Sequence, residues 1–369
     1  MGTVSVLVVD DSALMRNLIT RILEAEPDIR VAGTAMNGLF ALKKIETLKP
    51  DIIVLDLEMP EMNGIEFLKE RRRRGLDIPV IILSSIAEKG AQITMDALAY
   101  GASDFLLKPS GATQAGDLKV IAVQLVGMVR AYGGRCIGRE PASSEHRTPV
   151  AAPEAVRAEP SRLEARPAPA PKPPASIELI AIGISTGGPN ALREMLPHLD
   201  RAIPAPILIV QHMPVGFTKE FAESLAKICP LEVREASDGD LIKSGRILIA
   251  PGDRHMIVES KPLSRVVRLT DAPPMNGHRP SVDVLFASVA RAFGNHCMGV
   301  IMTGMGRDGA AELGTIHRHG GVTVAQDESS CVVYGMPKVA VESGYAQHIV
   351  SLSRMAETIN RLSLEHPPE

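Results

Sequence analysis

Tryptophan is absent from the sequence, aromatic residues make up only 3% of it, and its four cysteines are widely separated. Since no two of them form a C-x-x-C pair, the sequence favours neither a zinc site nor a small fold stapled by disulfides, and it is typical of a reducing compartment. The cysteines are Cys136, Cys229, Cys297 and Cys331.

Long apolar runs are also missing. No stretch approaches the roughly 20 residues that cross a bilayer. The first apolar run, Val4 to Val9, is followed directly by Asp10 and Asp11, which makes it too short and too soon charged for a secretory signal peptide. We therefore expect a cytoplasmic protein that does not insert into the membrane.

Charge of neither sign is in large excess. The chain contains 40 Lys plus Arg against 43 Asp plus Glu, and residues 176–369 contain 18 against 21. A protein that reads nucleic acid usually carries a basic surface that neutralises phosphates. Nucleic acid is thus a poor candidate partner, and a DNA-reading output domain is not indicated.

One segment separates two parts of the chain. Pro141 to Pro174 contains nine prolines and eight alanines, but no Ile, Phe, Met, Tyr or Trp. Such a segment cannot bury enough apolar surface to offset the entropy of ordering it. We predict a domain at residues 1–133, an extended linker at 134–176 and a second domain at 177–369.

Both parts alternate short apolar runs with helical stretches such as Met15 to Glu24 and Gly38 to Lys49. This alternation predicts an α/β fold with a doubly wound parallel sheet in each domain, in which reactive groups gather at the carboxyl ends of the strands. The predicted strands are Val4 to Val9, Ile52 to Leu55, Val80 to Leu83, Asp104 to Leu107, Leu179 to Ile184, Ile207 to Gln211, Arg246 to Ala250, Met298 to Met302 and Val322 to Gln326.

Polar residues end the strands of the first domain. They are Asp10, Asp11, Asp56, Ser84 and Lys108. Clustered carboxylates repel one another unless a cation lies among them, and oxygen ligands suit Mg²⁺. A carboxylate can also accept a phosphoryl group as a nucleophile. Taken singly, the first two could instead cap a helix, and the lysine could be a solvated loop charge.

Residues 3 to 130 resemble a response-regulator receiver domain. The resemblance implies that Asp56 is the phosphoacceptor, that Asp10 and Asp11 help it to hold Mg²⁺, and that Ser84 and Lys108 sense the phosphate. Phe105 stands where the family usually has a switching aromatic residue. Four arginines, 71 to 74, precede a glycine, and we interpret them as a solvated helix end that complements the helix dipole.

The second domain offers a possible hydrolytic triad. A G-x-S-x-G elbow places Ser185 after a strand, where its hydroxyl would stand above the sheet beside backbone N–H groups. The next strand ends at His212, a possible base, and a glycine-rich loop after a later strand carries Asp308, a possible orienting acid.

Alternatives remain open on the residues alone. The glycines at 304, 306 and 309 spell G-x-G-x-x-G, with Asp327 18 residues further on, a pattern that also occurs in dinucleotide sites. Asp308 would repel a pyrophosphate there, which argues against an NAD-binding oxidoreductase. His278 rivals His212 as the base, and the triad order of α/β-hydrolases would favour a later histidine such as His348.

The order of motifs resembles the chemotaxis protein-glutamate methylesterase (CheB) family. Its segments are Gly-x-Ser-Thr-Gly-Gly, Gln-His-Met-Pro, His-Arg-Pro-Ser-Val-Asp, Thr-Gly-Met-Gly-x-Asp-Gly and Gly-Met-Pro, after a receiver and linker. The resemblance implies Ser185 as nucleophile, His212 as general base, Asp308 as its orienting group and the Met305 N–H in the oxyanion hole.

The same resemblance implies an activity and its control. The enzyme would demethylate glutamyl methyl esters on chemoreceptors and deamidate glutamines, without a cofactor in the esterase domain. A chemotaxis histidine kinase would be the phosphodonor. The unphosphorylated receiver would pack over the esterase site and block it. A receiver-controlled regulator without hydrolase activity is the alternative.

Overall fold

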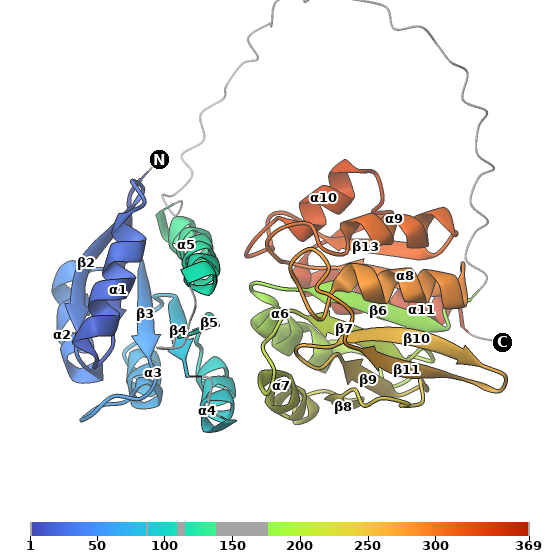
Figure 1. Ribbon diagram of the computed structural model, residues 1–369, viewed down its shortest axis with the longest axis horizontal. Coiled ribbons are helices and arrows are strands. Elements are labelled where there is room, and N and C mark those ends of the chain that lie inside the picture. The colour runs from blue at the N-terminus through green and yellow to red at the C-terminus, as the bar shows by residue number, and fades with distance from the viewer. Residues whose placement is uncertain (1, 86–87, 109–114, 138–175, 368–369) are drawn as a thin grey trace, which may run out of the picture.

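The computed structural model describes residues 2–85, 88–108, 115–137 and 176–367. They form two α/β domains that pack against each other (Figure 1). Residues 138–175, which hold nearly all of the predicted linker, lie outside the described residues. Among the helices that are described, none is long and apolar enough to span a bilayer.

The first domain is a five-stranded parallel sheet of order β2-β1-β3-β4-β5 with helices between its strands. The helices α1 and α5 contact each other, and the helices α2, α3 and α4 form a second contiguous group. The elements are β1 (Val4–Val9), α1 (Ala13–Glu24), β2 (Ile29–Ala35), α2 (Gly38–Leu48), β3 (Ile52–Asp56), α3 (Gly64–Arg73), β4 (Val80–Ser84), α4 (Glu88–Ala99), β5 (Asp104–Leu107) and α5 (Ala115–Ile137).

Local sequence explains where these elements begin. Every residue of β1, β3 and β4 is buried, as expected for central strands covered on both faces. Ser12, Asn37 and Asn63 each cap a helix by accepting a backbone N–H with the side chain. Helix α1 therefore starts directly after Asp10 and Asp11, at the end of β1.

The second domain has a seven-stranded parallel sheet of order β14-β13-β12-β6-β7-β9-β8 and an antiparallel hairpin, β10-β11. Helices α6, α7 and α11 pack on one face, and α8, α9 and α10 on the other. The elements are β6 (Leu179–Ile184), α6 (Gly188–Met195), η1 (Leu196–His198), β7 (Ile207–Gln211), α7 (Phe217–Ala226), β8 (Glu232–Glu235), β9 (Arg246–Ile249), β10 (His255–Lys261), β11 (Ser264–Thr270), α8 (Val282–Phe293), β12 (Cys297–Ile301), α9 (Ala310–Arg318), β13 (Val322–Gln326), α10 (Met336–Glu342), β14 (His348–Val350) and α11 (Leu352–Glu365).

The two domains share buried apolar surface. One hydrophobic cluster contains side chains of both domains. At their boundary, Phe105 of β5 stacks on Phe217 of α7, with ring centroids 5.1 Å apart and planes 10° from parallel. Figure 1 shows α4 and α5 on the side of the first domain that faces the second. This arrangement brings β5 and α5 to the carboxyl ends of β6 and β7.

The structure differs from the sequence-based expectations in three places. The strands β2, β8 and β14 and the hairpin β10-β11 were not predicted. Helix α5 continues to Ile137, past residue 133, where we placed the end of the first domain. Our interpretation of the arginine run as a wholly solvated helix end is wrong for Arg71, which is buried and donates hydrogen bonds to the carbonyls of Ile78 and Gly101. Its guanidinium ties α3 to two loops, while Arg73 and Arg74 pair with Glu70 at the surface.

Candidate active site and regulatory site

Three carboxylates meet at one edge of the first sheet. One oxygen from each of Asp10, Asp11 and Asp56 lies within 4.8 Å of the others. The ammonium of Lys108, which follows β5, lies 2.8 Å from Asp10 Oδ2 and 2.7 Å from Asp56 Oδ2. Burial raises the pKa of Asp56, although the lysine opposes the shift. Because the donors are all oxygens, the residues fit a Mg²⁺ ion.

Ser84 lies at the end of β4, beside the strand that carries Asp56, but its hydroxyl is engaged elsewhere. Ser84 Oγ is 2.7 Å from Thr94 Oγ1 of α4 and also contacts the carbonyl of Gly90. Its own carbonyl accepts the backbone N–H of Lys108. The structure therefore joins the predicted phosphate-sensing pair through the backbone, with the serine hydroxyl directed to α4.

Ser185 lies at the turn between β6 and α6, as the elbow motif predicts. Its N–H donates to the carbonyl of Thr303, and its carbonyl accepts the N–H of Gly188. Gly304 approaches so closely that a Cβ there would lie 2.8 Å from the Cβ of Ser185. A side chain at position 304 would thus displace the serine, which explains why a glycine follows Thr303.

A continuous hydrogen-bonded chain joins Ser185, His212 and Asp308. Ser185 Oγ lies 3.1 Å from Nδ1 of His212, and the opposite ring nitrogen, Nε2, lies 2.8 Å from Oδ2 of Asp308. Although these residues are far apart in the sequence, β6, β7 and β12 are neighbours in the sheet, and each residue follows one of them. The geometry is that of a hydroxyl, a base and an acid in series.

Asp308 is held by many donors. Besides the imidazole, its carboxylate accepts the side chains of Asn276 and Ser281 and the backbone N–H groups of Val282 and Asp283. Burial alone would raise the pKa of Asp308, but the hydrogen bonds from His212, Asn276 and Ser281 outweigh it and hold the pKa below its ordinary range. Asp308 therefore stays ionised and fixed in orientation.

Gln211 is a site residue that we did not predict. Its side-chain amide donates to the carbonyls of both Ser185 and His212, each at 3.1 Å. One buried side chain thus ties the two loops that carry the hydroxyl and the imidazole. The only signal in the sequence was its place directly before His212.

The other candidates take different places. His278, the rival base, stacks on His212, and none of the side-chain hydrogen bonds found among the described residues joins its ring to Ser185. His348 lies in β14, with β13 and β12 between it and β6. Gly309 caps α9, where a Cβ would lie 2.4 Å from the side chain of Val282. Contacts with Ser185 and with the start of α8 thus account for two of the three glycines in the G-x-G-x-x-G pattern.

Met305 lies in the same loop, directly after the close-packed Gly304. Its side chain reaches α5 of the first domain, since a Cβ added at Gly127 would lie 2.1 Å from the Met305 methyl carbon. The loop that carries the predicted oxyanion donor is therefore in contact with the neighbouring domain.

Known proteins share both parts of the chain. Residues 180–359 match the family model of the CheB methylesterase, and residues 6–117 that of the response regulator receiver domain. A protein-glutamate methylesterase/protein-glutamine glutaminase of Treponema denticola is 53% identical over 378 residues, which cover 99% of this chain and 100% of that protein. The chain belongs to the CheB family. A protein of the same name from Treponema pallidum is 48% identical, and the match covers 97% of this chain and 96% of that protein.

A solved structure supports the same assignment. The CheB methylesterase catalytic domain of Thermotoga maritima matches with a TM-score of 0.50 and 38% identity, covering 51% of this chain and 99% of that one. This CheB chain thus has an N-terminal receiver domain and a C-terminal esterase domain, both of α/β type, and it is a hydrolase.

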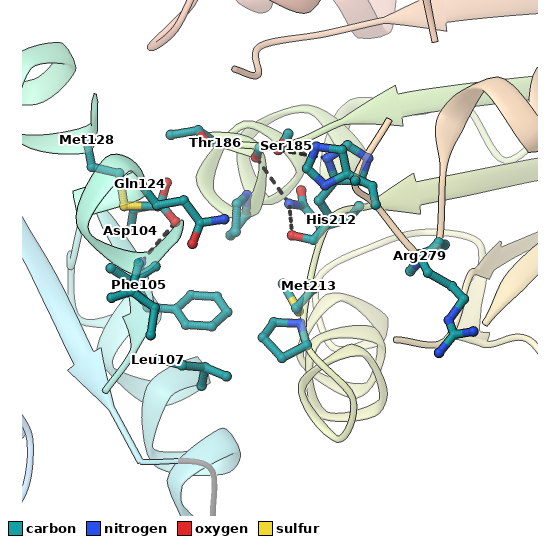
Figure 2. A pocket seen from close by; sticks show the side chains of 18 residues that line it. Asp104, Phe105, Leu107, Gln124, Met128, Ser185, Thr186, His212, Met213 and Arg279 are labelled. Carbon is teal, nitrogen blue, oxygen red and sulfur yellow. Dashed lines mark hydrogen bonds between the residues drawn. The ribbon is translucent and has the colours of Figure 1, made fainter. Parts of the chain in front are cut away.

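In this CheB chain the receiver covers the candidate active site. Ser185 and His212 line a cavity of about 330 Å³ whose other wall is formed by β5 and α5. Figure 2 shows Gln124 of α5 and Phe105 of β5 extending toward the loops that carry the candidate triad. Ser185 itself is only 9% exposed.

A receiver carboxylate also contacts the start of α6. Asp104 Oδ2 accepts the N–H of Gly187 at 2.8 Å, and the side chain of Asn190 donates to the carbonyls of Ala102 and Ser103. Gly187 is the N-cap of α6, has a positive φ of 81° and offers no side chain as a cap. The receiver therefore supplies the anion that the positive end of this helix attracts. Burial raises the pKa of Asp104 to about 6.

Proposed function

We propose that this protein hydrolyses glutamyl methyl esters on chemoreceptors through Ser185, His212 and Asp308. The observation that carries the proposal is the unbroken hydrogen-bonded series from the serine hydroxyl through both imidazole nitrogens to a buried carboxylate. Relatives that match along almost their whole length are named for this activity.

In the proposed reaction, Ser185 Oγ attacks the ester carbonyl while its proton passes to Nδ1 of His212. The resulting imidazolium is paired through Nε2 with Asp308, whose carboxylate stays ionised. His212 then returns the proton to the leaving methoxide, and methanol departs. Water, deprotonated by His212, hydrolyses the acyl-enzyme to release a glutamate and restore Ser185.

The tetrahedral intermediate needs donors for its oxyanion. We infer that the N–H of Met305 supplies one, because the approach of Gly304 to Ser185 brings the next peptide group beside the nucleophile. A positioned donor of this kind accelerates acyl transfer by roughly 100- to 1000-fold. Since a primary amide forms the same type of intermediate, with ammonia as the leaving group, glutamine deamidation is the second activity that we propose.

Control rests with the receiver. Asp56 accepts the phosphoryl group from a chemotaxis histidine kinase, and Asp10, Asp11 and Asp56 would hold the Mg²⁺ ion. When bound, the ion would neutralise charge on the transferring phosphoryl group. Lys108, which spans Asp10 and Asp56, is placed to release its contact with Asp56 and pair with the new phosphate.

Occlusion is the proposed means of inhibition. β5 and α5 wall the cavity onto which Ser185 opens, so the receiver stands where a receptor segment would approach the nucleophile. Asp104 also accepts a helix-end N–H two residues from the nucleophile. Lys108 follows β5 directly, so a change at Asp56 can reach the strand that carries Asp104 and Phe105. We place the protein in the cytoplasm, where receptor signalling domains and kinase are accessible.

Methanol release from methylated receptor membranes tests the activity. The phosphodonor-treated wild-type protein should release methanol, whereas Ser185→Ala should release none above the membrane background. Glu357→Ala, a change at an exposed residue of α11, serves as the control and should retain the rate. Release that persists undiminished in Ser185→Ala would refute the assignment of the nucleophile.

A further inference from the structure

The His278 ring lies flat against the imidazole of His212. The two ring centroids are 3.8 Å apart, and the planes are 8° from parallel. Both residues line the cavity onto which Ser185 opens. One face of the His212 ring is therefore covered by a second imidazole, while its two edges are held by Ser185 and Asp308.

The loop that carries His278 is fixed to the same acid. Met275 and His278 exchange two backbone hydrogen bonds in a tight turn. Within this turn Asn276 donates to Asp308 at 3.0 Å, and just after it Ser281 donates to Asp308 at 2.7 Å. The loop thus orients the carboxylate and places a ring on the imidazole in one rigid unit.

We propose that His278 is a positioning residue for the hydrolysis, whose flat ring holds the plane of His212 so that both imidazole nitrogens stay aligned with their partners. The inference rests on the proposed function, because it assigns His212 as the base. Hydrogen bonds at the two edges of the ring leave it free to tilt about the line that joins them. A ring stacked on its face removes that freedom.

The protonation state of His278 suits this position. Burial and the proximity of His212 lower the pKa of His278 to about 4, with Asp308 opposing the shift. His278 is therefore neutral when His212 becomes an imidazolium during turnover, so the stacked ring does not repel the charge that forms. The charged groups that face His278 and shift its pKa are His212 after β7 and Asp308 after β12. Arg279, its neighbour in the loop, is paired with Asp253.

Two variants separate stacking from filling of space. His278→Phe keeps a flat ring, and His278→Leu keeps an apolar side chain without one. With phosphodonor present, we expect the Leu variant to lose about 10- to 100-fold in kcat, since small misplacements of a base are that costly. Its KM for receptor should hardly change. The Phe variant should restore kcat to within roughly threefold of wild type, because the aromatic stack remains.

The pH profile of kcat distinguishes positioning from proton transfer. If His278 positions His212, the Phe variant keeps the pH dependence of kcat that the wild type shows on the acid side, because the base itself is unchanged. A Phe variant that is inactive, or that loses this pH dependence, would show that the His278 nitrogens take part in the chemistry. Equal, full activity of both variants would show that the stack does nothing.

The experiment distinguishes a failure of the proposed role of His278 from a failure of the proposed esterase activity. Thermal unfolding of each variant checks that it is folded, and if the Leu variant does not fold, the Phe variant still decides by its own kcat and pH profile. A wild-type protein that releases no methanol would contradict the proposed activity. If the wild type releases methanol but the Phe variant is as slow as the Leu variant, the proposed role of His278 is overturned and the proposed activity stands.

Discussion

Asp56 and Asp308 occupy equivalent places in two similar folds but have opposite surroundings. Each is a buried carboxylate at the carboxyl end of a parallel strand or in the loop that follows, with 3% and 1% of the residue exposed. Asp56 has a lysine as its main partner, and burial raises its pKa. Asp308 accepts hydrogen bonds from an imidazole, two polar side chains and the backbone, and these lower its pKa.

The two carboxylates have similar places in the fold but differ in the number of hydrogen-bond donors around them. This difference suits them to different roles. The oxygens of Asp308 are saturated by donors, so it is suited to hold His212 and not to attack. Asp56 shares the ammonium of Lys108 with Asp10, and a movement of Lys108 can expose the carboxylate of Asp56. A carboxylate of the second kind can accept a phosphoryl group and signal the change through its former partner.

Among the substitutions that test this comparison, we expect the largest effect on kcat at Asp308. Replacing it with Asn leaves the shape, but the NH₂ group takes the place of one acceptor oxygen. At Oδ2 it would face the imidazole and the Val282 N–H, and at Oδ1 it would face the donors of Asn276 and Ser281. We expect kcat for methanol release to fall by about 10⁴-fold, as when a triad acid is lost elsewhere, with little change in KM. A loss of less than tenfold would mean that the carboxylate does not orient His212.

Asp56→Asn should remove the stimulation by phosphodonor and leave the triad intact, whereas Asp308→Asn should remove the activity itself. The basal rate without phosphodonor should persist, because the triad is untouched, but phosphodonor and Mg²⁺ should no longer raise it. Methanol release measured with and without phosphodonor gives both quantities. If Asp56→Asn remained fully stimulated, Asp56 would not be the phosphoacceptor, and the contrast with Asp308 would lose its meaning.

A smaller effect is expected where the domains touch. Asp104→Ala removes the acceptor of the Gly187 N–H, a charge-assisted hydrogen bond of about 1.5–3 kcal/mol, and should loosen the receiver from the active site. We expect the basal rate without phosphodonor to rise about tenfold or more. Glu24→Ala, at the end of α1 and exposed, is the control that should leave it unchanged. A basal rate that stays at the wild-type value would contradict inhibition through this contact.

The smallest expected effect is a pH dependence of stability at the same residue. In the folded protein Asp104 has its pKa raised to about 6 from an ordinary value of 3.8. The folded state therefore binds the proton more tightly, and the stability that this contributes is lost as pH rises from about 4 to 6. The difference in melting temperature between Asp104→Asn and wild type should shift in favour of Asn between pH 5 and pH 7. A difference that is the same at both pH values would show that burial does not perturb Asp104.

Much of the fold follows from sequence patterns because its strands are central and uniformly apolar. Strands β1, β5, β6, β7 and β13 begin and end where we predicted. Strands β3, β4 and β9 differ by one residue at one end, and β12 is shifted by one residue at both ends. The hairpin β10-β11 was missed because most of its residues are exposed or only partly buried and its sequence mixes charged with apolar side chains, so it forms no continuous apolar run. Strand β8 is short and polar, so pattern alone gave no reason to predict it.

The site was predictable to a different degree. The residues at 185, 212 and 308 were candidates because each follows a strand of a parallel sheet, where reactive groups gather. The choice of His212 over His278 and His348 rested on the resemblance to the CheB family. The roles of Asn276, Ser281 and Gln211 depend on side-chain directions that no spacing encodes. Asp104 is the first residue of the short strand β5, and its contact with α6 depends on how the two domains dock. Arg71 shows the same limit, since a charged run gives no sign of which member is buried.

One measurement tests the central claim most directly: the initial rate of methanol release from methylated receptor membranes by the intact protein, before and after addition of a small-molecule phosphodonor with Mg²⁺. The account predicts a low rate that rises on addition in wild type, stays low in Asp56→Asn and is absent in Ser185→Ala under both conditions. A wild-type rate that does not respond to the phosphodonor, or release that continues without the serine hydroxyl, would contradict it.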